Sequence, residues 1–339
     1  MSNFSYAYAM GRVRAVERKM LSQGQFDRMI EASSPEDAFR ILREAEYGGA
    51  GPESQFAARD YERLLDAENE RLTAFIKEVS PEPRLLNIFL PRYDYHNIKV
   101  FLKAEFSGAA GDLPISRSGA IDPEKLAGFI RDRDLFNLPA HMAAGVQDAI
   151  QAYRQSVSAG SPDPQSIDIR LDRAMYAQML SEASGLQCPF IEHLVRIYID
   201  LANISAFLRM REMNKSAGFL RGALLPGGSV GHDIFIRFLQ DNADGFTGAM
   251  LHTPFARLCE DGLKSFKSSG RMTALELGAD NYVNAYIKKA KLLPMGLEII
   301  AAYYIARQTE LKNVRIAMVG KINGIAQGLI KERLRECYV

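Results

Sequence analysis

Few residues of this 339-residue chain have the types and spacing that catalysis requires. The stretch 222–229 reads GALLPGGS and is similar to a phosphate-binding loop, but Gly228 stands where such a loop needs the lysine that reaches the outer phosphates. The five histidines are dispersed, and no two of them have the spacing of metal ligands. The sequence therefore predicts a protein that is not an enzyme, with no catalytic, cofactor-binding or metal-binding residues.

A different polar pattern occurs three times. An acidic residue stands three positions before an Asn, and an aliphatic residue follows the Asn directly. We call these pairs the acid–Asn motifs, and they are Asp94/Asn97, Asp200/Asn203 and Glu310/Asn313. The step from 97 to 203 is 106 residues and the step from 203 to 313 is 110 residues. Self-similarity at a steady period is typical of structural repeats, so the motif predicts three related units.

Two roles are open for the acid–Asn motifs. Residues three apart on a helix share a face, so both side chains can bind the same neighbouring segment. In a structural role they satisfy buried polar groups and fix the register of each unit. In the alternative role they form a surface that recognises a partner. The threefold repetition favours the structural role, because an active site rarely needs three copies within one chain.

The elements that must position these motifs are helical nearly throughout. In the second motif Ile197, Leu201, Ile204 and Leu208 recur at spacings of three and four, which is the period of an amphipathic helix. Strands with alternating polarity are scarce, so we expect an all-α protein. The helices are predicted at residues 4–22, 35–46, 55–79, 94–106, 123–135, 139–157, 170–183, 190–214, 232–243, 252–267, 272–290 and 296–336.

The repeat predicts three helical units, at residues 1–110, 111–220 and 221–339, with the N-terminal helix able to pack with the third. Each unit has a candidate helix start upstream of its motif. Ser34 before Pro35 and Asp122 before Pro123 combine a capping side chain with a proline at the first helical position. Gly231 opens the third copy without the proline, so it is the weakest of the three.

Composition excludes several classes of function. The formal net charge is +1, which gives no field for binding nucleic acid or an anionic surface through the whole protein. Three widely spaced cysteines form neither a disulfide framework nor a zinc pattern, which favours a reducing, cytosolic compartment. The N-terminus lacks the apolar core of a signal peptide. The most apolar stretch, 295–306, is short for a bilayer span and contains Glu298.

Five segments, in order along the chain, resemble those of one family. They are YAYAMGRVRAVE at 6–17, the helix and aromatic residue at 34–47, YDYHNIK at 93–99, the LPGG turn at 225–228 and ELKNVR at 310–315. Together they resemble the C subunit of the prokaryotic V-type (V/A-type) ATPase or ATP synthase, a relative of the d subunit of the eukaryotic V-ATPase. The resemblance covers essentially the whole chain, although the section 130–190 carries little that can be matched.

The resemblance implies three similar helical units around a pseudo-threefold axis, arranged as a funnel. It further implies a non-catalytic rotor subunit that joins the central stalk to the membrane ring of proteolipid subunits and transmits torque during ion transport. Such a protein is peripheral, on the cytoplasmic face of the membrane, and needs no span of its own. The competing interpretation is a free-standing α-helical scaffold for protein interaction, whose repeat period is usually shorter, at about 30–50 residues. A third alternative, a helical enzyme, needs convergent titratable residues that the sequence does not reveal.

Two segments are candidates for the partner interface. One is the basic opening helix and the other is the glycine-rich turn after the second motif. An ordinary solvated face and an ordinary surface loop are the alternatives for them, and these are favoured for both. The candidate residues are Arg12, Arg14, Arg18, Pro226, Gly227 and Gly228.

Overall fold

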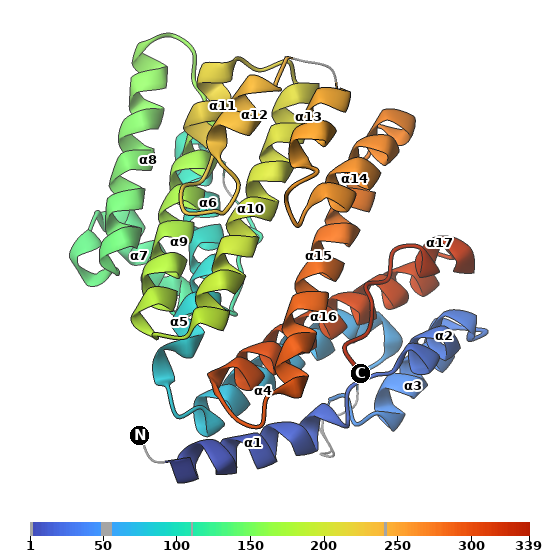
Figure 1. Ribbon diagram of the computed structural model, residues 1–339. Coiled ribbons are helices and arrows are strands. Elements are labelled where there is room, and N and C mark those ends of the chain that lie inside the picture. Colours follow the sequence, from blue (N-terminus) through green and yellow to red (C-terminus); the bar gives the residue numbers. More distant parts are fainter. Residues whose placement is uncertain (1–2, 49–55, 110, 241–242) are drawn as a thin grey trace. The chain divides into compact units, whose positions relative to one another are not determined.

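The protein is all-α, as the sequence predicts. The structure is a computed structural model that describes residues 3–48, 56–109, 111–240 and 243–339. Within these residues every regular element is an α-helix or a short 3-10 helix (Figure 1).

The chain forms two compact units. One contains Arg84–Cys259, and we call it the middle unit. The other combines Met1–Pro83 with Glu260–Val339, and we call it the N/C unit. These units are defined by packing, whereas the three predicted units follow the sequence repeat, so the three-unit division remains a prediction.

The middle unit is built around α9 (Gln165–Gly185), which contacts four other helices. These are α5 (Leu86–Phe89), α6 (Pro91–Ser107), α8 (Ala140–Ser158) and α10 (Pro189–Glu212). The apolar faces of α6, α8 and α9 share one core, in which Tyr95, Val146 and Leu171 are fully buried. The remaining helices are α7 (Pro123–Asp132), α11 (Ala217–Ala223), α12 (His232–Arg237) and α13 (Ala243–Met250).

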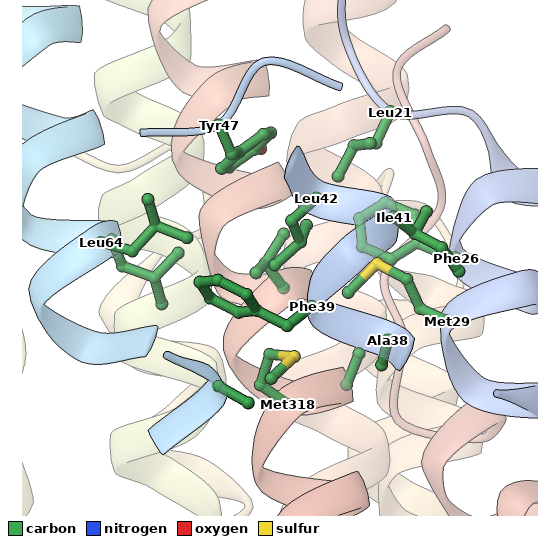
Figure 2. Packing of buried hydrophobic residues seen from close by; sticks show 14 of the residues in the cluster. Leu21, Phe26, Met29, Ala38, Phe39, Ile41, Leu42, Tyr47, Leu64 and Met318 are labelled. Atoms are coloured by element: carbon green, nitrogen blue, oxygen red, sulfur yellow. The ribbon is translucent and has the colours of Figure 1, made fainter. Parts of the chain in front are cut away.

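The N/C unit is built around α16 (Leu297–Ile322). This helix contacts α1 (Asn3–Glu17), α2 (Gln23–Glu31), α3 (Pro35–Glu44), α4 (Tyr61–Val79), α15 (Thr273–Lys288) and α17 (Gln327–Lys331). Phe39 and Leu42 of α3 pack beside Met318 of α16, and Leu64 of α4 lies on their other side (Figure 2). The two ends of the chain therefore share one hydrophobic core. Helix α14 (Ala256–Ser269) spans the boundary between the two packing units.

Several helix starts follow directly from local sequence. Ser34 accepts a hydrogen bond from the amide of Asp37 at 3.1 Å, and Pro35 occupies the first turn of α3. Asp122 caps α7 by accepting from the amides of Glu124 and Lys125, both at 3.1 Å, with Pro123 in the first turn. Capping side chains satisfy amides that have no partner inside the helix, so these sequences specify where the helices begin.

Other boundaries differ from the sequence prediction. The predicted helix 296–336 ends at Ile322, because Asn323 and Gly324, whose φ is +62°, form a turn before α17. The predicted helix 4–22 ends at Glu17, and the predicted helix 232–243 ends at Arg237, with part of the latter prediction outside the described residues. The predicted helix 55–79 begins at Tyr61, and its first residue is not described. Helices α2, α11 and most of α13 were not predicted.

Candidate functional site: three buried acid–Asn motifs

The first acid–Asn motif lies on α6, and both of its side chains are fully buried. The Asn97 side-chain amide donates to the carbonyl oxygen of Ser116 at 2.8 Å, and its oxygen accepts from the Ser116 amide at 2.7 Å. One side chain therefore satisfies both backbone polar groups of one loop residue, which fixes the loop against the helix.

Asp94 binds the same loop at its far end. Its carboxylate accepts from the amides of Ala120 at 3.0 Å and Ile121 at 3.1 Å. Burial raises the pKa of Asp94 to about 6, although these two amides act to lower it. A Cβ on Gly119 would lie 2.0 Å from the Asp94 carboxylate, so this close approach requires glycine.

The second motif, on α10, repeats this geometry. Asn203 donates to the carbonyl oxygen of Leu225 at 2.9 Å and accepts from the Leu225 amide at 2.7 Å. Asp200 accepts from the amides of Ser229 at 2.9 Å and Val230 at 3.0 Å, and from the Ser229 hydroxyl at 2.6 Å. A Cβ on Gly228 would lie 2.2 Å from the Asp200 carboxylate. Gly228 thus occupies the position that Gly119 occupies in the first motif.

The third motif, on α16, is completed by both ends of the chain. Asn313 exchanges two hydrogen bonds of 2.9 Å with the backbone of Arg335, which follows it by 22 residues, as Leu225 follows Asn203. Glu310, however, accepts from the amide of Leu21 at 2.8 Å, 289 residues earlier in the sequence. The N-terminal segment therefore takes the place that the following loop takes in the other two motifs.

The hydrogen bonds also show how the helix starts correspond. In each motif the acid binds the amide of an apolar residue that directly precedes a helix N-cap. These pairs are Ile121 and Asp122, Val230 and Gly231, and Leu21 and Ser22. From N-cap to motif Asn the spacing is 81 residues from 122 to 203, 82 from 231 to 313, and 75 from 22 to 97. Ser22 rather than Ser34 is thus the N-terminal counterpart of Asp122 and Gly231.

Glu310 also differs from the other two acids in having charged neighbours. It accepts hydrogen bonds from the Tyr47 hydroxyl and from the Arg307 guanidinium. Arg307 also binds Glu68 at 3.0 Å, and Arg71 pairs with the same carboxylate. Burial raises the pKa of Glu310, and the charge of Arg307 opposes that rise. We call these five residues, which are Tyr47, Glu68, Arg71, Arg307 and Glu310, the ionic network.

The interface candidates on α1 are partly used within the N/C unit. Arg12 pairs with Glu78 at 2.9 Å, and Arg14 pairs with Glu17 at 2.7 Å. Arg14 also donates to backbone carbonyls in the segment that follows α15. Arg18 is exposed. Of the three arginines, Arg18 therefore has the side chain best placed to meet a partner.

The turn candidates lie in the loop that the second motif binds. Pro226 is exposed, while Gly228 packs against the Asp200 carboxylate. Gly227, with a φ of +96°, accepts a hydrogen bond from Arg196 at 3.0 Å. The structure gives two of these residues contacts within the middle unit, and the interface itself remains a prediction.

Sequence reasoning missed the partners of the motifs. Gly119, Leu21 and the ionic network were not singled out. Gly119 could have been found from its place just before the Asp122–Pro123 helix start, which Gly228 matches in the second copy. The Leu21 pairing has no local signal because it joins residues from opposite ends of the chain.

All three acids bind backbone amides, so these sites hold segments of the chain itself. Among the described residues no three His, Cys, Asp or Glu side chains are grouped as metal ligands would be. None of the helices that the structure describes is both long and apolar enough to cross a bilayer.

This all-helical chain with three buried motifs matches one family along almost its entire length. Residues 9–333 match the family described as ATP synthase (C/AC39) subunit, and the chain belongs to that family.

Named relatives agree with this family. The chain is 26% identical over 326 residues to the C subunit of the V-type sodium ATPase of Enterococcus hirae, covering 96% of this chain and 97% of the relative. It is 22% identical to the C subunit of the A-type ATP synthase of Methanocaldococcus jannaschii, covering 97% and 86% of the two chains. It is 20% identical to the corresponding A-type ATP synthase protein of Pyrococcus horikoshii, covering 91% and 85%.

Proposed function

We propose that this chain is the non-catalytic rotor subunit of a V/A-type ATPase or ATP synthase. In this role it is a rigid adaptor that couples the central stalk to the membrane proteolipid ring, transmitting torque for ion transport. One observation carries the proposal: the family match over residues 9–333, with relatives named as C subunits that align along nearly their whole length.

The packing supports a mechanical role. An adaptor that transmits torque has to resist deformation, and close-packed interiors with satisfied polar groups are stiff. Each acid–Asn motif ties a loop to a core helix through at least three hydrogen bonds, and its two side chains are at most 4% exposed. The motifs thereby reduce the freedom of the loops that follow α6, α10 and α16.

The chain ends support the same role. Leu21 and Arg335 both bind α16, so the N-terminal and C-terminal segments are fastened to one helix. This arrangement is compatible with three units, at 1–110, 111–220 and 221–339, that close around a pseudo-threefold axis as a funnel. In that arrangement the cavity of the funnel receives the stalk, and the opposite face rests on the ring at the cytoplasmic side of the membrane.

The interface candidates can be ranked from their surroundings. Arg18 and Pro226 are exposed, so they are the first positions to vary in a test of partner binding. Arg12, Arg14, Gly227 and Gly228 have contacts within their own packing units, so changing them would alter structure together with any interface.

Purification from native membranes tests the proposal. The tagged chain is isolated in a gentle detergent, and the proteins that accompany it are identified by mass spectrometry. We expect subunits of the ATPase head, the stalk and the proteolipid ring. Recovery of the chain alone from the soluble fraction would contradict the proposal and favour a free-standing helical scaffold.

A second measurement tests coupling. Membranes that lack the chain are expected to lose ATP-driven ion transport while the head retains ATP hydrolysis, and adding the purified chain is expected to restore transport. Arg18→Glu is expected to weaken this restoration, with Lys267→Glu as the matched control, because Lys267 is exposed on α14. Full restoration by Arg18→Glu would remove Arg18 from the interface.

A further inference from the structure

The segment that joins α15 to α16 exposes an unusual group of apolar side chains. It consists of the 3-10 helix η4 (Lys289–Leu292) and the loop that leads to Leu297. Leu292 is 86% exposed, and Leu293 and Met295 are 36% and 45% exposed. We call Leu292, Leu293 and Met295 the apolar tip. Three exposed large apolar side chains within four residues form a patch of the kind that marks an interaction site.

The apolar tip is held in place by the opening helix. The Arg14 guanidinium donates to the carbonyl oxygens of Ala290, Lys291 and Leu293 at 3.4, 3.1 and 3.5 Å. Pro294 restricts the backbone within the tip. Arg14 therefore acts as a positioning residue that keeps Leu292 turned outward.

The end of the tip is fixed by glycine. Gly296 has a φ of +146°, and a Cβ there would lie 2.0 Å from the Glu298 carboxylate. Any other residue at this position would be strained, so the chain leaves the tip along one defined path into α16. A segment held in its exposed form loses little conformational freedom on binding.

Lysines lie directly beside the apolar tip. Lys288, Lys289 and Lys291 precede it within four residues. Lys289 lies over the Tyr286 ring at 5.1 Å, and Lys291 lies over the Tyr338 ring at 4.3 Å. These contacts hold two ammonium groups close to the tip. The nearest acid recorded for Lys288 is Glu336, at 3.9 Å.

We propose that this segment is a lipid contact, in which the apolar tip enters the surface of a bilayer that carries anionic headgroups. Leucine and methionine side chains bury apolar area at the boundary between headgroups and acyl chains. Lys288 and Lys289 lie where phosphate groups would be, and ammonium groups near an anionic leaflet add to the attraction. The combination of a bare apolar tip with adjacent lysines is complementary to such a surface in both charge and polarity.

This inference goes beyond the proposed function, which places the chain on a protein ring and assigns it no contact with lipid. It also differs from membrane spanning, because only a loop enters the surface. A charged protein surface would satisfy the lysines, but it would leave Leu292 and Met295 without an apolar environment.

Vesicle flotation of the full chain tests the lipid contact. We expect the chain to float with vesicles of phosphatidylglycerol and phosphatidylcholine and to float less with phosphatidylcholine alone. Leu292→Ser is expected to weaken binding roughly tenfold, because burial contributes about 0.8 kcal/mol per CH₂ group. Lys288→Gln with Lys289→Gln is expected to weaken binding to the anionic vesicles by roughly fivefold per lysine.

A matched control separates a specific contact from general stickiness. Phe136 is 97% exposed in the middle unit, so Phe136→Ser removes a larger exposed apolar side chain from another surface. This variant is expected to bind vesicles like the parent chain. Because Leu292 and Phe136 are both exposed, neither substitution is expected to change the melting temperature.

Three outcomes would overturn the inference. They are no flotation of the parent chain, equal flotation of the Leu292→Ser variant, and an equal loss in the Phe136→Ser variant. Co-purification of stalk and ring subunits without vesicle binding would overturn the lipid contact and leave the proposed function standing. Vesicle binding without any ATPase subunits would do the reverse.

Discussion

The second and third acid–Asn motifs solve the same structural problem with different chemistry. On α10, Asp200 and Asn203 bind a loop that follows the helix directly, and every recorded hydrogen-bond donor to Asp200 is a neutral backbone amide or hydroxyl. On α16, Asn313 binds the following segment in the same way, but Glu310 reaches the N-terminal segment and joins a set of buried charges. The Asn has one role in both regions, and the acid has two.

The difference shows what joining distant segments requires. Where the chain is continuous, a short Asp and a glycine that permits close approach are sufficient. Where the partner comes from the other end of the chain, a longer Glu is used and Arg307 and Tyr47 surround it. A buried charge without a partner is costly, so the ionic network makes the third motif the one most sensitive to substitution.

Glu310→Ala tests this comparison with the largest expected effect. Removing one partner of a buried ion pair usually costs about 3–5 kcal/mol, because the remaining charge is left uncompensated. Asp200→Ala removes hydrogen bonds without leaving a buried cation and is expected to cost about 1–3 kcal/mol. Denaturant unfolding of the two variants measures both values. Equal losses would show that the ionic network adds nothing to the third motif.

Asn203→Leu tests the feature that the motifs share. The substitution leaves the amide and carbonyl of Leu225 buried without partners, which is expected to cost about 2–4 kcal/mol. Asn313→Leu is expected to have a similar effect in the N/C unit. Asn87→Leu is the control, because Asn87 is exposed on α5 in the same unit as Asn203. An unchanged melting temperature together with weaker partner binding would place Asn203 at an interface instead.

The pH dependence of stability distinguishes the neutral surroundings of the first motif. Asp94 has a pKa of about 6 in the folded chain and an ordinary value of 3.8, so the folded state binds the proton more tightly. Stability therefore rises as the pH falls from 7 to 4, by at most about 3 kcal/mol. Asp94→Asn is expected to remove this rise in unfolding experiments between pH 4 and pH 7. A rise that persists in the variant would assign it to other groups.

Gly228→Ala has the smallest expected effect and tests the close approach in the middle unit. The added methyl group would displace the Asp200 carboxylate from the Ser229 and Val230 amides, at a cost of about 1–2 kcal/mol. Gly222→Ala is the control, because a Cβ at that helical position meets nothing within 4 Å. Thermal unfolding compares the two variants. Equal melting temperatures would mean that the loop can move away from Asp200 without cost.

The sequence predicted the helices and the motif residues because both depend on short-range patterns. Apolar spacing revealed α10, and the Asp–Pro pair revealed the start of α7. The end of α16 was missed although Asn323 and Gly324 are a common turn pair, since the apolar period continues beyond them. The contact between Glu310 and Leu21 could not be predicted, because no local pattern connects residues 289 positions apart.

The way in which the third motif joins both chain ends has a consequence for synthesis on the ribosome. The middle unit, residues 84–259, contains all the partners of its two motifs and can fold as soon as it has emerged. Leu21 and its neighbours emerge first, but they must wait for Glu310, at a synthesis rate of about 5–20 residues per second. For tens of seconds the apolar residues Leu21, Phe26 and Met29 lack the α16 surface that buries them (Figure 2). We therefore expect the N-terminal segment to be the part of the nascent chain that chaperones bind.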